Sequence, residues 1–248
     1  TPSIEYIWSV DDVELQNSAD SFFQLDINTA GLGAEVACLI RAYDSFLDFS
    51  ESEARVDIIN APPRIGSVSL TPEEVYSQDS ITCSVLDVTD LEEQPTTYTI
   101  EWTIDGALQD ETQDTLSGPF EVDSEVTCTA IAFDGVKYSE PVSATTIINN
   151  TLPTIDSLFI DPATDLTAQS QTECFAQASD IDGGAPLVLY SWELANGFVL
   201  AEDPFISFDP QQIFPDDEVF CIVTAIDQHG GTTTESASVV ILNSAPKI

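Results

Sequence analysis

A motif of the form Glu-Val-x-Cys-x-x-x-Ala-x-Asp occurs three times in this sequence. Its cysteines are Cys38, Cys128 and Cys221, so successive copies lie 90 and then 93 residues apart. This repeat constrains the fold more than any other feature. A step of this size in a chain of 248 residues indicates small domains in tandem rather than one large core.

An alternating segment that ends in tryptophan precedes each copy of the motif. The three segments are IEYIW (4–8), YTIEW (98–102) and VLYSW (188–192). Large apolar side chains recur at every second position, which is typical of a strand with one buried face. Turn residues divide the rest of the chain into short segments that show no helical periodicity. The sequence therefore predicts an all-β protein.

A third recurring feature is an aliphatic stretch that ends in asparagine and is soon followed by proline. The pairs are Asn60 and Pro63, Asn149 and Pro153, and Asn243 and Pro246. Such short junctions predict domains that are coupled rather than joined by a flexible linker. We expect a partial first domain at 1–60, complete second and third domains at 61–150 and 151–244, and the start of a following repeat at 245–248.

Two further cysteines, Cys83 and Cys174, precede the tryptophans of the second and third copies only. The order Cys-Trp-Cys is expected of a two-sheet sandwich in which a disulfide crosses the core and the tryptophan packs on it. We predict the disulfides Cys83–Cys128 and Cys174–Cys221, and hence an oxidising, extracellular compartment. Five reduced core cysteines in a cytosolic protein are the alternative. The recurrence of cysteine at one strand position in all three copies disfavours it.

Cys38 has no partner in its own copy of the repeat. In the two complete copies the tryptophan follows the proline by 39 residues, whereas Trp8 lies close to the first residue. We therefore expect about 31 residues ahead of Trp8 in the parent protein, with two opening strands and a cysteine that bonds to Cys38. Alternatively, another chain donates these strands and Cys38 bonds between chains.

These features resemble the immunoglobulin-like and PKD-type, cadherin-like repeats of bacterial and archaeal surface proteins. The resemblance covers nearly the whole chain, and its matching pieces are TIDG (103–106), ELANG (193–197), AFDGVKYSEP (132–141), AIDQHGGTTTES (225–236) and the closing INNTLP and LNSAP. The full PKD signature Trp-Asp-Phe-Gly-Asp-Gly is absent, so the resemblance is to the broader immunoglobulin-like class. It implies tandem immunoglobulin-like β-sandwich domains with a structural role.

The charge of the chain excludes several partners. There are 44 Asp and Glu residues against 5 Lys and Arg, for a formal net charge of −39. Such a surface should repel nucleic acid and anionic membranes. No apolar run is long enough to span a bilayer.

The sequence also gives no sign of an enzyme, and we expect no catalytic residues. The single histidine, His229, lies in the turn DQHGG, and there is no phosphate-binding loop, CxxC or HExxH.

We expect no obligatory cofactor, but calcium is a candidate ligand. In this fold the loop between the second and third strands, the loop between the last two strands and the start of the domain share one pole. Acidic residues gather there, and calcium prefers oxygen ligands. Chance placement on an acidic surface is the alternative. The candidate ligands are Asp87, Asp90, Asp134, Asp180, Asp182 and Asp227.

Two further surface features are candidate sites. The outward face of the repeated cysteine strand carries apolar residues, which predicts self-association; shielding by neighbouring side chains is the alternative. These residues are Leu39, Tyr43, Ile131, Phe133, Ile222 and Ile226. Asn149 begins an N-glycosylation sequon, NNT, at the junction between the second and third domains.

Together these observations predict a structural extracellular repeat protein that builds a filament, stalk or surface layer. Its expected partners are copies of itself or further repeats of the same chain. The alternative is an adhesin or ligand-binding surface protein with a glycan or protein receptor, or an accessory module of a secreted enzyme.

Overall fold

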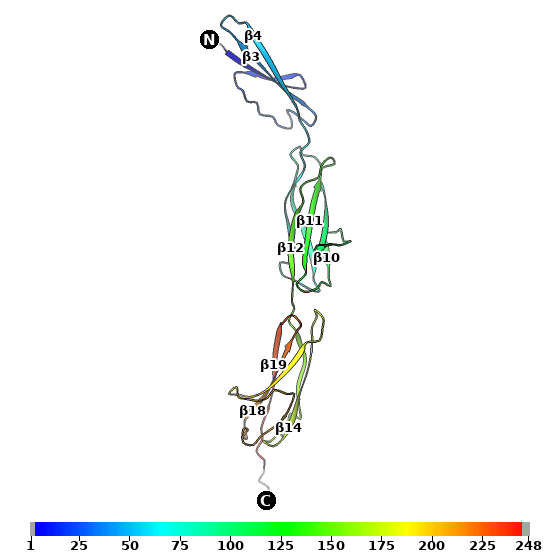
Figure 1. Ribbon diagram of the computed structural model, residues 1–248, viewed down its shortest axis with the longest axis vertical. Helices are drawn as coiled ribbons and strands as arrows, with labels where there is room; N and C mark the ends of the chain where they lie inside the picture. The colour runs from blue at the N-terminus through cyan, green and yellow to red at the C-terminus, as the bar shows by residue number, and fades with distance from the viewer. Residues whose placement is uncertain (1–2, 245–248) are drawn as a thin grey trace.

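The computed structural model describes residues 3–244, and its 19 regular elements are all β-strands. The strands form three groups that follow one another along the longest axis of the molecule (Figure 1). The strands of each sheet come from one predicted domain range only. The expected repeat start at 245–248 lies outside the described residues.

The first domain consists of one antiparallel sheet with the order β2-β1-β3-β4. Its strands are β1 (Ser3–Val10), β2 (Val13–Ser18), β3 (Glu35–Tyr43) and β4 (Phe49–Asp57). Residues 19–34 connect β2 to β3 without forming a strand. From this connection Leu25 and Ala30 pack against a small cluster around Val10 and Val36.

The second domain contains two sheets. One has the order β10-β7-β5 and the other the order β6-β12-β11-β8-β9. The strands of the first sheet are β5 (Arg64–Thr71), β7 (Ser80–Thr89) and β10 (Thr115–Ser117). Those of the second sheet are β6 (Val75–Tyr76), β8 (Thr97–Ile104), β9 (Ala107–Leu108), β11 (Glu125–Phe133) and β12 (Val142–Asn149).

The third domain repeats this architecture with the sheet orders β13-β14-β17 and β16-β15-β18-β19. The strands of the first sheet are β13 (Thr154–Asp161), β14 (Gln171–Ser179) and β17 (Phe205–Ser207). Those of the second sheet are β15 (Leu187–Leu194), β16 (Val199–Ala201), β18 (Glu218–Ile226) and β19 (Thr232–Val240).

Each complete domain buries its core between its two sheets. Along β11 and β18 every second residue is buried, as the period of a strand with one inward face requires. Trp102 and Trp192 are both 0% exposed, so the inward placement that their strand parity predicts is correct. The fold class predicted from the sequence is thus confirmed: the chain is all-β, with the two-sheet sandwich of immunoglobulin-like domains.

Tight turns set the pairing of the strands beside the core. Asp105 and Gly106 join β8 to β9 with φ angles of 49° and 78°. Two left-handed residues in a two-residue loop give the hairpin turn that matches the twist of the strands, and Asp-Gly is a preferred pair for it. Asp11 and Asp12 make the corresponding turn between β1 and β2, with φ angles of 50° and 63°.

Candidate functional site

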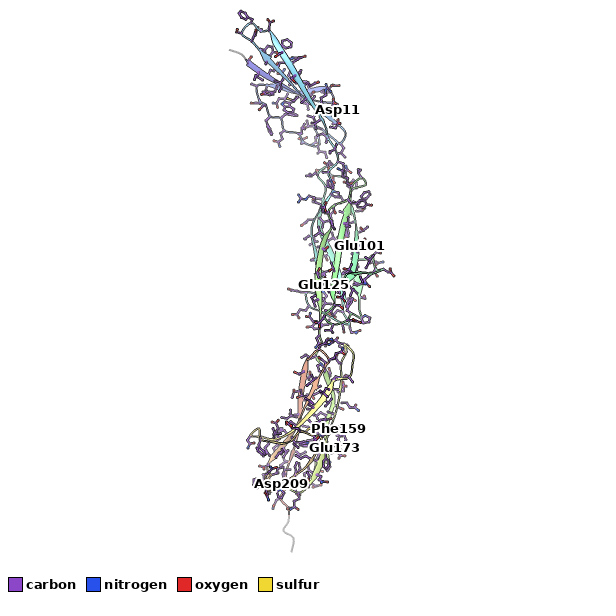
Figure 2. All side chains as sticks on the ribbon, viewed as in Figure 1. Asp11, Glu101, Glu125, Phe159, Glu173 and Asp209 are labelled. Atoms are coloured by element: carbon purple, nitrogen blue, oxygen red, sulfur yellow. A yellow bond between two sulfur atoms is a disulfide. The ribbon has the colours of Figure 1, made fainter. Side chains whose placement is uncertain are left out.

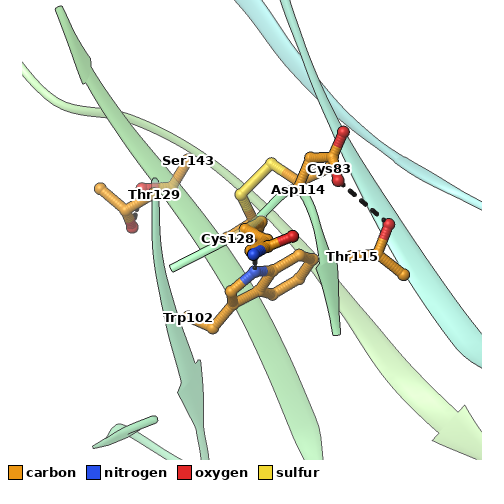
Figure 3. The surroundings of a disulfide bond; sticks show 8 residues. Cys83, Trp102, Asp114, Thr115, Cys128, Thr129 and Ser143 are labelled. Carbon is orange, nitrogen blue, oxygen red and sulfur yellow. Dashed lines mark hydrogen bonds between the residues drawn. A yellow bond between two sulfur atoms is a disulfide. The ribbon is translucent and has the colours of Figure 1, made fainter. Parts of the chain in front are cut away.

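The two predicted disulfides are both present in the structure. Cys83 bonds to Cys128 and Cys174 to Cys221, with Cα–Cα distances of 6.3 and 6.4 Å. Each bond crosses the core from one sheet to the other. Figure 3 shows the indole of Trp102 beside the first of them. The bonds are consistent with an extracellular location, because reducing compartments keep such thiols apart.

A backbone carbonyl accepts a hydrogen bond from each buried indole. Trp102 Nε1 donates to the carbonyl of Gln113 at 2.8 Å and Trp192 Nε1 to that of Pro204 at 3.3 Å. The carbonyls lie just before β10 and β17, the outer strands of the first sheet in each domain. A buried donor without an acceptor costs free energy, so these bonds help to fix the connection across the core.

Cys38 is a free thiol and is half-buried. Burial raises its pKa above the ordinary value, so the thiol is protonated at neutral pH. The thiolate is the nucleophile, so this shift slows reaction of the thiol without preventing it. Its expected bond to a cysteine outside the chain stays a prediction.

The aspartate that ends each copy of the motif shapes the turn that follows it. Asp134 Oδ1 accepts the backbone N–H groups of Val136 and Lys137, both at 2.6 Å. Asp227 Oδ1 accepts those of His229 and Gly231, both at 2.8 Å. The first role of the repeated aspartate is therefore to close the loop between the last two strands, as Asx turns do.

The second oxygen of each aspartate holds the chain where it enters the domain. Asn60 Nδ2 donates to Asp134 Oδ2 at 2.9 Å, and Asn150 Nδ2 donates to Asp227 Oδ2 at 2.8 Å. The Asn150 bond is the main cause of the lowered pKa of Asp227. The pKa of Asp134 is also lowered. Desolvation of this carboxyl acts in the opposite direction, but the hydrogen bonds from Lys137 and Asn60 outweigh it.

The junction between the second and third domains carries one more link. Asp182 Oδ1 accepts the hydroxyl of Ser77 and its Oδ2 accepts the N–H of Thr151, both at 2.5 Å. Ser77 belongs to the second domain and is only 2% exposed. A single carboxylate of the third domain thus binds both the second domain and the linker.

At the earlier junction, contacts to the linker come from the second domain. Gln94 Nε2 donates a hydrogen bond to Asn60 Oδ1 at 2.6 Å. Lys137 Nζ donates one to the backbone carbonyl of Asn60 at 2.5 Å. Glu92 Oε2 accepts the N–H of Ala61 at 3.3 Å.

Several of these junction residues were not singled out from the sequence. The sequence pattern pointed to Asn149, but Asn150 is the residue that corresponds to Asn60. Alignment on the prolines gives the right match, because Asn60 and Asn150 both precede their proline by three residues. Ser77 carries no sequence signal of its own, since its partner lies 105 residues away.

The predicted calcium ligands only partly come together. Asp90 Oδ1 accepts two backbone N–H groups and Asp180 Oδ1 accepts one, while Oδ2 of each is buried without a hydrogen-bond partner. Asp87 instead lies within β7, exposed, with its Cβ against Gly66. Within residues 3–244 no group of three or more His, Cys, Asp or Glu side chains is placed to hold a metal ion. Both oxygens of Asp134 and Asp227 already accept hydrogen bonds, so their fit to calcium is incomplete.

The other predicted surface residues lie as follows. The six residues proposed for self-association are half-buried rather than exposed: Leu39, Tyr43, Ile131, Phe133, Ile222 and Ile226. Phe133 stacks on Tyr138 with ring centroids 4.5 Å apart. Asn149 is exposed, although its side chain donates to the carbonyl of Val75 at 3.1 Å. His229 is exposed in its turn.

A more exposed apolar surface lies on the opposite sheet of the third domain. Phe159 of β13 and Phe175 of β14 stack with centroids 5.1 Å apart, and they are 53% and 37% exposed. Phe205 of β17 is 49% exposed on the same sheet. Figure 2 labels Phe159 beside Glu173 and shows other acidic residues along the chain, from Asp11 to Asp209. This phenylalanine cluster lies outside the repeated motif, so the sequence pattern did not predict it.

The proteins similar to this chain are solved structures of low sequence identity. No family model matches the sequence, and no curated protein matches it. One similar structure is of a Ca²⁺-stabilised adhesin that helps an Antarctic bacterium to reach out and bind ice, with TM-score 0.33 and 13% identity over 98% of this chain. Another is of a 1.5-MDa bacterial ice-binding adhesin, with TM-score 0.31 and 15% identity over 98% of this chain and 87% of that chain.

The eight N-terminal immunoglobulin domains of the Down Syndrome Cell Adhesion Molecule align with TM-score 0.43 and 16% identity over 98% of this chain. This chain spans 65% of the Antarctic adhesin structure and 35% of the eight-domain one. All three TM-scores are below 0.5, so the fold assignment rests on the sheets and disulfides described above. Residues 3–244 contain no helix with the length and apolar character needed to cross a membrane.

Proposed function

We propose that this chain is part of an extracellular repeat protein whose immunoglobulin-like domains stack into a rod and build a filament, stalk or surface layer. The role is mechanical rather than catalytic. The domains set a distance and transmit tension, and the junctions keep successive domains in a fixed relation.

The observation that carries this proposal is the bonding of the linker at the second junction. Asn150 is held by Asp227, and Thr151 by Asp182, while Asp182 also binds Ser77 of the preceding domain. Two linker residues are thus bonded to the third domain, and the second domain is bonded to one of the same carboxylates, so bending the junction requires these bonds to break. A flexible tether between independent binding modules has no need of such bonds.

The disulfide across the core of each complete domain supports the same role. A disulfide that closes a loop of 45 or 47 residues stabilises a domain by about 4 kcal/mol in the chain-entropy view. The bond also keeps the two sheets joined when the domain is pulled. The net charge of −39 opposes non-specific association between rods and keeps them soluble.

Calcium binding at the junctions remains a second element of the proposal. It is supported by the buried, unpartnered Oδ2 atoms of Asp90 and Asp180, which occupy the same position in two domains. A cation there would complete its shell from linker carbonyls and water, because calcium takes six to eight oxygen ligands. Melting of the purified chain with excess calcium and with excess EGTA tests this. A higher melting temperature in calcium is expected, and identical curves would remove calcium from the account.

The main proposal is tested on native material. Antibodies raised against the purified chain should label a filament, stalk or layer outside the cell in immuno-electron microscopy. Labelling confined to the cell interior, or recovery of the parent protein only as a small soluble monomer, would overturn it.

An adhesive function is the second candidate, and the phenylalanine cluster favours it. Stacked, exposed aromatic rings on a sheet face are typical of a surface that binds a partner. Replacing Phe159 and Phe175 by Ser should reduce attachment of the chain to its target surface while leaving the melting temperature of the domain nearly unchanged. The matched variant replaces Ile131 and Phe133 by Ser. If this second variant alone prevents association between copies, the repeated cysteine strand is the contact instead.

A further inference from the structure

The sheet of the first domain presents an inner face that has no second layer among residues 3–244. The strand pairing identifies this face, because Trp8 lies opposite Cys38 as Trp102 lies opposite Cys128 and Trp192 opposite Cys221. In the second and third domains the equivalent face is covered by the sheets β10-β7-β5 and β13-β14-β17. The described part of the first domain, residues 3–60, contains only the one sheet, β2-β1-β3-β4.

Apolar side chains on this face are partly exposed. Ile40 is 37% exposed, whereas Ala130 and Val223 at the same strand position are 0% exposed. Cys38 is half-buried, while Cys128 and Cys221 are both 0% exposed. The face is therefore apolar in sequence but only partly covered.

Part of the covering layer is already in place next to this face. Asp26 lies 12 residues before Cys38, as Asp209 lies 12 residues before Cys221. The carbonyl of Asp26 accepts the N–H groups of residues 29 and 30, and that of Asp209 accepts those of residues 212 and 213, all at 2.9–3.0 Å. The turn at 26–30 thus folds like the turn at 209–213 of the third domain.

One part of this connection corresponds to a strand of the third domain but forms no strand here. In the third domain, residues 205–207 form β17, which pairs with β14. The corresponding residues 22–24 of the first domain form no strand. Phe23, in the place of the buried Ile206, stacks on Trp8 with ring centroids 6.1 Å apart.

The indole of Trp8 gives an independent sign that the layer is incomplete. Trp8 Nε1 is buried and has no acceptor among the described residues. In the complete domains, the acceptor is a carbonyl just before the strand that corresponds to residues 22–24. A buried N–H without a partner costs free energy, which closing this layer would recover.

From this open face we infer a docking site for two antiparallel strands that enter the fold ahead of β1 and resemble β13 and β14 of this chain, with a cysteine on the second strand bonded to Cys38. The second strand pairs with residues 22–24 along its free edge. Its cysteine faces Cys38, as Cys174 faces Cys221.

The covalent step is ordinary disulfide formation. The two thiols lose two protons and two electrons in total, and the electrons pass to a small-molecule or protein disulfide, which is reduced to two thiols. The strands belong ahead of β1 because both other domains have them there, with Cys83 and Cys174 preceding Trp102 and Trp192. A second copy of the chain fits this face less well. The connection that carries Phe23 already covers part of the face, and its residues 22–24 still lack a strand to pair with.

Two fusions of the full chain test the inference. Residues 63–94 or residues 153–184 of this chain are placed directly before Thr1, which reproduces the spacing between cysteine and tryptophan in the second and third domains. Refolding in a buffer of reduced and oxidised glutathione should give a third disulfide, between Cys38 and the added cysteine, in peptide mapping by mass spectrometry. Cys38 should lose its reactivity toward iodoacetamide, and the indole N–H of Trp8 should become protected from hydrogen exchange.

A matched pair of fusions carries Ser in place of the added cysteine. In these the Trp8 indole should still be protected while Cys38 remains a thiol, which separates docking of the strands from the bond itself. If Cys38 stays as reactive in both cysteine-bearing fusions as in the original chain, the inference is wrong. Dimers linked through Cys38–Cys38 in the fusions would also overturn it and assign the face to a second copy.

Discussion

Removal of the disulfide of the third domain should destabilise that domain and leave the second domain intact. The bond Cys174–Cys221 closes a loop of 47 residues. The chain-entropy relation gives about 4 kcal/mol for a loop of this length. A typical domain is stable by only about 5–15 kcal/mol, so the loss is a large part of the total.

The assay is urea unfolding of the variant in which Cys174 and Cys221 are both replaced by Ala, followed by NMR signals assigned to each domain. With a denaturant dependence of about 2 kcal/mol per molar urea, the midpoint of the third domain should fall by roughly 2 M. Signals of the second domain should keep their midpoint, because its own bond Cys83–Cys128 and its separate core are unchanged.

The matched control is Cys38→Ser, which removes a free thiol and no disulfide. It should leave the midpoints of the second and third domains where they are. Equal midpoints for the double variant and the original chain would refute the stabilising role of the bond. A parallel fall in both domains would refute their independence as folding units.

Three further predictions concern the second junction. Asn150→Ala should lower the melting temperature of the third domain, whereas Asn149→Ala, which loses only a bond to the second domain, should not. Asp227 has a pKa below its ordinary 3.8 in the folded chain, so the stability it contributes is present above that value and is lost as pH falls through its folded pKa. In the Asn150→Ala variant the pKa of Asp227, followed by NMR, should lie nearer 3.8, and the variant should lose less stability in acid. An unchanged pKa would contradict the role of this bond. Gly231→Ala should loosen the junction like Asn150→Ala, because its Cβ would collide with the Asp227 carboxylate; calorimetry that shows no change would refute this close packing.

The parts of the fold that the sequence predicts are those built from short-range periodicity and repeated spacing. Alternation along the tryptophan and motif strands gives the buried faces, and the recurrence of cysteine at one strand position gives the disulfide partners. Both signals depend on residues that can lie in few places in the fold, because a large indole and a disulfide between sheets fit only in the core.

The junction contacts could not be predicted in the same way. The bond between Ser77 and Asp182 joins two residues that are common in loops and lie in different domains. In an acidic chain, no single aspartate stands out as the one that crosses between domains. The phenylalanine cluster was missed for a related reason, because Phe159, Phe175 and Phe205 come from three strands whose pairing only the structure gives.

The most direct test of the central claim is a measurement of how the second and third domains are oriented relative to each other in solution. Residual dipolar couplings from residues 64–149 and 154–241 of the weakly aligned chain report the orientation of each domain separately. A rigid junction predicts that one alignment tensor fits both sets of couplings, and that Asn150→Ala separates them. Two tensors of clearly different magnitude in the unmodified chain would contradict the rod and show that the junction is a flexible tether.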